Sequence, residues 1–326
     1  MKAVRVNEFG GPAVLQLQEI ETPRPSAGQA LVRLRAAGLN FIDIYQRRGT
    51  YARKLPFTPG LEGAGVVEAV GEGVTNVKAG DRVAYTGQPG AYAEASIVQA
   101  ESLIPLPESF SFEQGAAFPL QGMTAHYLIH EFHMPKPGEV VLIHAAAGGM
   151  GLLLAQWAKH LGARVIGTVS TEVKAKAARE AGANDVILYT DQDFVAETKR
   201  LTSGHGADLI IDGVGKTTFA GNLQAAALRG HIVIFGAASG PADPIVPNSL
   251  MTRSLSVSGG SLQNYLLTRD ELLRRAKDVI EAIQAEWLRF HVYRVFPLAQ
   301  ASEAHRVLEN RQTIGKVLLS TTNAAG

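Results

Sequence analysis

The stretch Val140–Gly151 reads VVLIHAAAGGMG and decides the fold class of the chain. Its apolar start is typical of a buried strand, and the glycine-rich turn that follows opens a helical pattern. Such a turn lets the backbone approach dinucleotide phosphates closely, while the N–H groups and positive dipole end of the next helix face their charge. From Glu139 to Ser170 the pattern reads strand, turn, helix and strand, over roughly the 30 residues that a βαβ unit needs.

A glycine turn alone is weak evidence, because Ala146 stands where G-x-G-x-x-G has its first glycine. The helix expected after the turn carries large apolar residues at three- and four-residue spacings and stops at Gly162, a C-cap position. Strand, turn and helix in this order favour a nucleotide site over a purely structural turn. The predicted contacts of the turn are Ala147, Gly148, Gly149, Met150 and Gly151.

The second strand of the unit ends in Ser170 and Thr171, and this ending bears on which nucleotide binds. NAD sites usually place an acid about 20 residues beyond the glycines, to hold the ribose 2′-hydroxyl. Hydroxyls with Lys174 nearby instead suit a 2′-phosphate, which an acid would repel. Glu172 is discordant, and the alternative is that Ser170 and Thr171 cap a helix beginning near Glu172. Because one helix start can serve both purposes, NADPH is the predicted cofactor.

Composition favours a cytoplasmic enzyme with two domains. The chain has 326 residues, 46% of them hydrophobic, and a formal net charge of +1, so no global field attracts nucleic acid or an anionic membrane. Its apolar runs fall short of the ~18 residues of a membrane span, and no apolar segment of a secretion signal follows Met1–Arg5. Zero cysteine excludes disulfides, thiol nucleophiles, iron–sulfur clusters and cysteine-ligated zinc.

The first hundred or so residues are rich in alternating strand patterns and predict a compact, barrel-like β domain. A capping box at Ser111 and Gln114 begins a helix. Pro119 and Gly122 are expected to bend or break this helix, so the crossing between domains is placed near Gln121.

Beyond this crossing, apolar strand candidates alternate with helical stretches, which implies a doubly wound parallel sheet. The candidates are residues 140–145, 164–169, 185–189, 208–212, 231–235 and 254–258. An amphipathic helix over 269–286 and a closing strand over 315–319 follow.

Several further stretches match one family in order along nearly the whole chain. They are Ala36–Asp43 (AAGLNFID), Pro59–Gly65 (PGLEGAG), Val70–Val83 with its VG and GDRV ends, Ala145–Gly151, and Phe235–Gly240 (FGAASG). With them, the chain resembles the medium-chain dehydrogenase/reductase superfamily, and most closely its zinc-free quinone oxidoreductases, the group that includes zeta-crystallin.

The resemblance implies a GroES-like catalytic domain from residues 1–121 and 265–326, with a Rossmann NADP-binding domain of residues 122–264 inserted between them. It implies that Asn40, Asp43, Tyr45 and Tyr51 line the cleft beside the nicotinamide. On the nucleotide side it places Thr124 and Tyr127 near the nicotinamide, Tyr189 near the adenosine end, and Phe235, Gly236 and Ala237 against the cofactor. The chain departs from the family pattern in two places: Ala237 stands where relatives carry a polar residue, and Gly259-Gly260 where some carry an arginine.

An alternative for the first set is structural. Asn40 and Asp43 could cap a short helix, and Tyr45 and Tyr51 could be core or rim residues.

No metal site is predicted. Zinc-dependent relatives carry a cysteine near position 40 and a histidine before the glutamate of the Gly-x-Glu motif, where this chain has Asn40 and Leu61. His126, His130 and His133 fall on one helical face, a spacing that can bind zinc, but a polar helix face is the simpler interpretation.

Without a metal to polarise it, the acceptor must already be electrophilic. The predicted activity is therefore an NADPH:quinone oxidoreductase. The alternatives are an NADPH-dependent reductase of α,β-unsaturated carbonyls, and a non-catalytic NADPH-binding protein of the crystallin or RNA-associated kind. The expected strand over 254–258 lies at a sheet edge that favours pairing with a second copy, so a homodimer is predicted.

Overall fold

The computed structural model describes residues 1–51 and 53–321 of the chain, which form two compact units. The β-rich unit comprises Met1–Leu120, Leu266–Lys277 and the chain from Phe290 onward, and the α/β unit comprises Gln121–Tyr265 and Asp278–Arg289. The domain limits expected from the sequence stay a prediction.

A parallel sheet forms the centre of the α/β unit. Its strands are β8 (Val140–Ile143), β9 (Arg164–Val169), β10 (Asp185–Leu188), β11 (Ala207–Asp212), β12 (Ala226–Ile234) and β13 (Ser256–Gly259). They lie in the order β10-β9-β8-β11-β12-β13, and each neighbouring pair is parallel. The order reverses at β8, so the crevice that binds ligands in such sheets lies between β8 and β11. The predicted doubly wound fold is confirmed.

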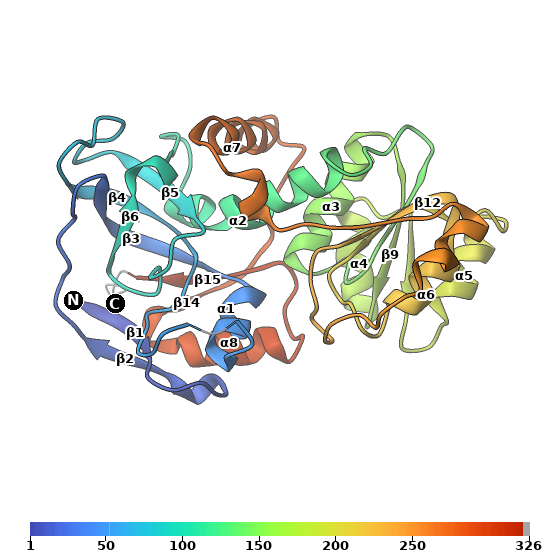
Figure 1. Cartoon of the computed structure of the whole chain (residues 1–326), viewed down its shortest axis with the longest axis horizontal. Helices are drawn as coiled ribbons and strands as arrows, with labels where there is room; N and C mark the ends of the chain where they lie inside the picture. Colours follow the sequence, from blue (N-terminus) through green and yellow to red (C-terminus); the bar gives the residue numbers. More distant parts are fainter. Residues whose placement is uncertain (52, 322–326) are drawn as a thin grey trace. The chain divides into compact units, whose positions relative to one another are not determined.

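Helices flank this sheet, as Figure 1 shows. They are α3 (Gly149–His160), α4 (Glu172–Glu180), α5 (Phe194–Leu201) and α6 (Phe219–Ala225). α3 packs against α4, and α5 packs against α6. Local sequence sets their ends: Gly162, at φ 83°, follows α3, and Asp193 caps α5 by accepting a hydrogen bond from Val195 N–H.

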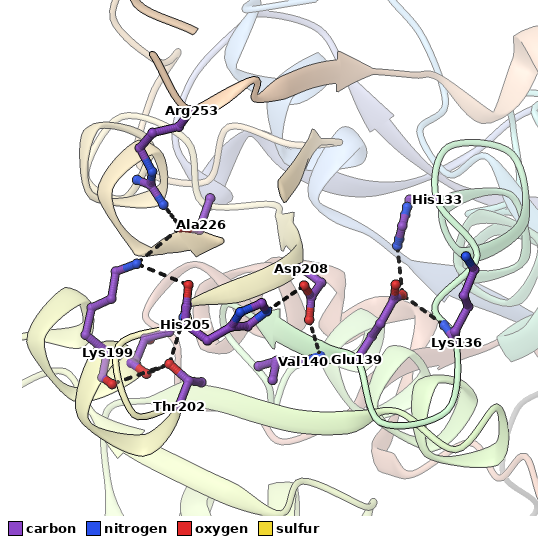
Figure 2. Close-up of polar contacts among 12 residues, drawn as sticks. His133, Lys136, Glu139, Val140, Lys199, Thr202, His205, Asp208, Ala226 and Arg253 are labelled. Carbon is purple, nitrogen blue, oxygen red and sulfur yellow. Dashed lines mark hydrogen bonds and ion pairs between the residues drawn. The ribbon is translucent and has the colours of Figure 1, made fainter. Parts of the chain in front are cut away.

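Carboxylates secure the loops at the amino-terminal ends of β8 and β11 (Figure 2). Asp208 accepts a hydrogen bond from Val140 N–H at 2.8 Å through one oxygen, and its other oxygen lies 2.8 Å from His205 Nε2. Glu139 Oε2 lies 2.9 Å from both His133 Nε2 and the Lys136 amide nitrogen. These side chains hydrogen-bond to one another and to the backbone at the amino-terminal edge of the sheet, whereas sheets of this kind bind ligands at the opposite, carboxyl edge.

The β-rich unit contains a mostly antiparallel sheet. Its strands are β3 (Gln29–Leu39), β4 (Glu62–Val70), β5 (Arg82–Thr86), β6 (Ala95–Gln99), β7 (Ile104–Pro105), β14 (Val292–Pro297) and β15 (Lys316–Ser320). They lie in the order β14-β15-β3-β4-β5-β7, with β6 also paired to β3. β15, red in Figure 1, lies antiparallel beside blue β3, so two segments far apart in the sequence are neighbours in this sheet.

Shorter elements surround this sheet and its apolar core. β1 (Lys2–Val6) pairs with β2 (Leu15–Glu19). The remaining helices are α1 (Phe41–Arg48), α2 (Phe112–His130), α7 (Arg269–Gln284) and α8 (Ala301–Glu309), and the 3-10 turns are Pro12–Val14, Ala100–Ser102, Pro247–Arg253, Leu262–Tyr265 and Leu298–Gln300. Within the described residues, no helix is both long and apolar enough to cross a membrane.

α2 does not break at Pro119 or Gly122, although a break was one of the two outcomes expected there. It runs without interruption from Phe112 to His130. Proline removes one backbone donor and crowds the preceding turn, which usually costs about 3 kcal/mol. Here the next amide, Leu120 N–H, donates to the Glu62 carboxylate at 2.6 Å. The Glu62 side chain, from β4, therefore accepts the hydrogen bond of a backbone N–H group in the turn of α2 that contains Pro119.

Candidate active site

The glycine turn lies at the carboxyl end of β8, where Gly148 is the N-cap of α3. A Cβ on Gly148 would contact only the Ala145 carbonyl oxygen, at 3.2 Å, so the turn leaves open space before the helix. A Cβ on Gly151 would instead lie 2.4 Å from that oxygen. The first glycine allows close approach of a phosphate, and the second allows the helix to pack onto the turn.

The alanine at position 146 is compatible with this packing because its neighbour on β9 is also small. A Cβ added to Gly167 would lie 2.7 Å from the Ala146 Cβ. The close contact that a first glycine normally permits is thus made by a glycine on the adjacent strand. Ala147 is buried beside it, and Met150 lies partly exposed in the first turn of α3.

The residues predicted to hold a 2′-phosphate lie together after β9. Lys174 Nζ donates to Ser170 Oγ at 3.3 Å, and Thr171 caps α4 by accepting from Lys174 N–H. The capping alternative is therefore confirmed for Thr171 only, whereas Ser170 pairs with the Lys174 ammonium. Glu172 lies 3.9 Å from Arg179, further along α4.

Tyr189 belongs to the same edge of the sheet. It follows β10, its amide nitrogen donates to Val169 O at 3.1 Å, and its side chain is 42% exposed. An exposed tyrosine thus follows β10 with its backbone next to the end of β9, and its contact with the adenosine stays a prediction.

A buried polar network that the sequence did not reveal lies beneath the turn. His144 Nε2 lies 2.7 Å from Asn222 Oδ1, and Asn222 Nδ2 donates to Asp212 at 2.7 Å. Since the Asn222 amide donates to the carboxylate, its oxygen faces His144, which must carry its proton on Nε2. His144 Nδ1 then accepts from the Thr168 hydroxyl at 3.0 Å. Burial lowers the pKa of His144, so the ring is neutral and ties together the ends of β8, β9 and β11.

Phe235, Gly236 and Ala237 follow β12 and lie beside the end of β11. The Phe235 amide donates to Asp212 O at 3.0 Å, and a Cβ on Gly236 would lie 2.8 Å from Gly213 O. These three residues are thus at the carboxyl edge of the sheet, and their contact with the cofactor stays a prediction.

Thr124 and Tyr127 are buried on α2. The Tyr127 hydroxyl donates to Gly260 O at 3.0 Å, and its ring stacks on Tyr265 at 4.5 Å. A Cβ at Gly260 would lie between 2.9 and 3.2 Å from the rings of Phe132, Tyr127 and Tyr265. The glycine that replaces the longer side chain of some relatives is therefore required by aromatic packing.

In the β-rich unit, Asn40 precedes α1 and is 4% exposed. Its Oδ1 accepts from Lys316 Nζ at 2.8 Å, and its Nδ2 donates to Glu62 Oε2 at 2.9 Å. Lys316 Nζ also lies 2.6 Å from Glu62 Oε2, with both side chains buried. The amide of Asn40 is thus held in one orientation by a buried ion pair.

Asp43 is completely buried, three residues into the same segment. Its Oδ2 accepts hydrogen bonds from Asn40 N–H at 2.8 Å and from the Tyr92 hydroxyl at 3.2 Å. Oδ1 has no hydrogen-bond partner among the described residues. Burial raises the pKa of the Asp43 carboxyl to about 7, while the Asn40 amide, Lys316 and Tyr92 oppose that rise. The capping alternative is therefore correct for Asp43.

Tyr45 and Tyr51 lie apart from Asp43. Their rings meet edge to face at 5.5 Å, and Tyr51 is 53% exposed. Phe41, 6.3 Å from Tyr45, extends this aromatic patch. The four predicted acceptor-side residues therefore divide into a tyrosine pair, with Tyr51 exposed and Tyr45 partly buried, and a buried polar pair.

The residues present do not fit a zinc ion. Around Asn40 and Glu62 the place of a cation is taken by the Lys316 ammonium, whose charge opposes metal binding. The helical histidines have separate partners: His126 lies 2.9 Å from Asp278, His130 accepts from Trp157 Nε1, and His133 lies 2.9 Å from Glu139. Across residues 1–51 and 53–321, no cluster of three or more His, Cys, Asp or Glu could hold a metal.

Asp43→Asn tests the protonation of this buried carboxyl. The pKa is raised from 3.8 to about 7 in the folded protein, so the stability that Asp43 contributes is present at low pH and is lost as pH rises through about 7. The parent should lose roughly 2 kcal/mol of folding stability between about pH 5 and about pH 8, whereas D43N has no such carboxyl to ionise. We therefore expect the Tm of D43N minus the Tm of the parent to rise over this pH range. Asp270→Asn, at an exposed carboxylate of the same unit, should show no such trend. A flat difference for D43N would contradict the elevated pKa.

Family models match both parts of the chain. Residues 26–108 match the model described as the alcohol dehydrogenase GroES-like domain, and residues 149–280 match the model described as zinc-binding dehydrogenase. The second description names a metal that the residues around Glu62 do not accommodate.

Relatives extend this similarity to the full length. A quinone oxidoreductase of Pseudomonas aeruginosa is 42% identical over 321 residues, covering 98% of this chain and 99% of its own. A 2-haloacrylate reductase of a Burkholderia species is 41% identical over 326 residues, covering 97% and 98%. The crystal structure of Escherichia coli quinone oxidoreductase complexed with NADPH matches with a TM-score of 0.95 at 40% identity, covering 98% and 100%. The chain therefore belongs to the quinone oxidoreductase family of the medium-chain dehydrogenase/reductase superfamily.

Proposed function

We propose that the protein is a metal-independent NADPH:quinone oxidoreductase. The observation that carries this proposal is the Lys316 ammonium held against Asn40 and Glu62. A site built around this lysine has no metal to polarise an unactivated carbonyl, so it suits an acceptor that is electrophilic by itself, such as a quinone. Sequence identity of about 40% to quinone oxidoreductases over nearly the full length supports the same activity.

NADPH is the proposed reductant, and when bound it supplies the hydride. The amides of Gly148, Gly149, Met150 and Gly151, with Ala147, are proposed to face its pyrophosphate, and Ser170, Thr171 and Lys174 its 2′-phosphate. The remaining proposed contacts are Tyr189 at the adenosine and Thr124, Tyr127, Phe235, Gly236 and Ala237 towards the nicotinamide. The NADPH complex of the similar Escherichia coli enzyme supports this choice of cofactor.

On the acceptor side, Tyr45 and Tyr51 are proposed to contact the quinone, because they form an aromatic pair after Asn40 in which Tyr51 is exposed. Flat aromatic faces pack well against a flat conjugated ring, and a tyrosine hydroxyl can donate to the oxygen that gains charge. Asn40 is proposed to border the same site. Asp43 lies behind it and supports the helix start.

A second candidate is the reduction of α,β-unsaturated carbonyl compounds by the same site. The observation that favours it is 41% identity over the full length to a 2-haloacrylate reductase. An activated alkene accepts hydride at carbon while charge develops on a conjugated oxygen, so the same donors would serve.

The acceptor class is tested by following NADPH oxidation with the purified, chelator-treated protein against a panel of quinones, enones and 2-haloacrylates. We expect quinones to give the highest kcat/KM. Preference for enones or haloacrylates would select the second candidate, and no turnover with any acceptor would contradict both.

Tyr51→Ala tests the acceptor side in the same assay. It should reduce kcat/KM for the acceptor by about 10-fold or more while leaving the Kd for NADPH nearly unchanged. Tyr293→Ala, which removes a 40% exposed tyrosine from β14, is the matched control and should change neither. Equal loss of acceptor turnover and NADPH binding in Y51A would contradict the assignment.

Lys174→Ala tests the cofactor. Loss of a charge-assisted contact to the 2′-phosphate should lower the preference for NADPH over NADH by about 10- to 100-fold, through KM for NADPH. Lys176→Ala on the same helix is the control, since Lys176 is exposed and lies 3.9 Å from Glu180. An unchanged preference in K174A would indicate that the 2′-phosphate binds elsewhere.

We further propose that the protein is cytoplasmic and forms a homodimer through β13, the terminal strand of the parallel sheet. Leu228, Val246 and Met251, in the neighbouring segments, are each at least 66% exposed. Unpaired strand edges and exposed apolar side chains favour pairing with a second copy.

Sedimentation equilibrium tests the dimer. At micromolar concentration the mass should be twice the 34.7 kDa of one chain. Met251→Asp, which places a charge in the proposed interface, should shift the equilibrium towards the monomer. A monomeric parent protein would contradict the proposal.

A further inference from the structure

A chain of hydrogen bonds runs through the interior of the β-rich unit and ends at Asp43. Arg47 NH1 lies 3.1 Å from His305 Nδ1. His305 Nε2 lies 3.2 Å from the Tyr92 hydroxyl, and that hydroxyl lies 3.2 Å from Asp43 Oδ2. All four side chains are completely buried, and they come from α1, α8 and the loop before β6.

The direction of each hydrogen bond follows from the chemistry of the groups. A guanidinium can only donate, so His305 Nδ1 must accept from Arg47. Burial and the nearby Arg47 charge lower the pKa of His305, so its ring is neutral and carries its single proton on Nε2. Nε2–H then donates to the Tyr92 oxygen, and the Tyr92 hydroxyl proton donates to Asp43. Every donor points towards the carboxylate.

The far end of this chain is anchored. Arg47 Nε donates to Gly10 O at 3.1 Å, and Arg47 NH2 lies 2.6 Å from Glu309. Because Arg47 occupies Nδ1 and does not release its protons, His305 has no route for passing a proton outward. The arrangement therefore holds Asp43 in place and does not conduct protons.

The near end fixes the start of α1. Asp43 Oδ2 accepts from Asn40 N–H as well as from Tyr92, so the Tyr92 hydroxyl keeps the carboxylate in its capping position. Asn40 and Tyr45, both in the proposed acceptor site, are positioned by this first helical turn.

We propose that Tyr92 and His305 are positioning residues of the acceptor site, which act through Asp43 on Asn40 and the first turn of α1. This inference rests on the proposed function, since it assigns these residues to the acceptor and not to NADPH. It deepens that function by adding two buried residues from outside the sequence motifs.

Other charged groups face Asp43 as well. Lys316 from β15 favours its ionised form and Glu62 from β4 opposes it, while the Arg47 guanidinium and the neutral His305 ring lie beyond Tyr92 in the hydrogen-bond chain. Because the Tyr92 hydroxyl stabilises the carboxylate, removing it moves the pKa of Asp43 further upward. A positioning role therefore predicts a shift in a pH profile as well as a loss of rate.

Tyr92→Phe is the central test, and Tyr85→Phe is its matched control. Tyr85 is an equally buried tyrosine of the same unit, in β5, and lies outside the hydrogen-bond chain. We expect Y92F to lower acceptor kcat/KM about 10-fold, with KM for NADPH within about 2-fold of the parent value. The plot of acceptor kcat/KM against pH should shift to higher pH in Y92F, because loss of the Tyr92 hydroxyl raises the pKa of Asp43. Y85F should change none of these quantities.

Two variants of His305 separate a hydrogen-bonding role from a packing role. A glutamine side chain carries an acceptor and a donor that can replace Nδ1 and Nε2 in the same order, whereas leucine carries neither. His305→Gln should therefore retain most acceptor turnover, and His305→Leu should lose it as Y92F does. Equal loss in both variants would overturn the proposal.

Hydrogen exchange of the α1 peptide gives a measurement that does not need turnover. Y92F should exchange at least several-fold faster than Y85F over the first turn of α1. Equal exchange in the two would overturn the proposal whatever the activity, and so would faster exchange with unchanged acceptor kinetics. If the parent protein reduces no acceptor, the proposed function fails, while exchange still decides whether Tyr92 holds α1.

Discussion

The Glu62 carboxylate is the interaction on which the β-rich unit depends most. It accepts hydrogen bonds from Lys316 at 2.6 Å, from the Asn40 amide at 2.9 Å and from Leu120 N–H at 2.6 Å. One buried anion thus joins β4 to β15, to the start of α1 and to α2 at its internal proline. Removing one partner of such a buried pair typically costs about 3–5 kcal/mol, because the remaining charge is left without compensation.

The α/β unit depends on a different constraint, the close approach of backbone segments at the carboxyl ends of its strands. Gly148 leaves space for a ligand, Gly151 brings α3 onto the turn, and Gly167 makes room for Ala146. Beneath them the neutral His144 and the Asp212 carboxylate hold three strand ends in register. In each unit the residues proposed to bind a ligand therefore adjoin a buried polar network.

The sequence predicted what depends on local pattern. The strands and helices of the parallel sheet, the αL glycine after α3, the cap at Thr171 and the Ser170–Lys174 pair all follow from residues close together in the chain. Contacts between distant residues could not be read in this way. Nothing near Asn40 indicates Lys316, which is 276 positions away, and His305 and Asn222 have no motif of their own. The uninterrupted course of α2 through Pro119 could not be predicted for the same reason, since the acceptor for Leu120 N–H comes from another strand.

The position of Lys316 in the chain has a consequence for synthesis. Residues are made in order, and Asn40 and Glu62 leave the ribosome long before β15 exists. Until then the Glu62 anion lacks its counterion, so β4 and the start of α1 have no stable buried arrangement. The parallel sheet, from β8 to β13, is complete before β15 is made. In a nascent chain the parallel sheet should therefore fold first. The amino-terminal strands of the other unit should reach their final packing only after β15 has been made.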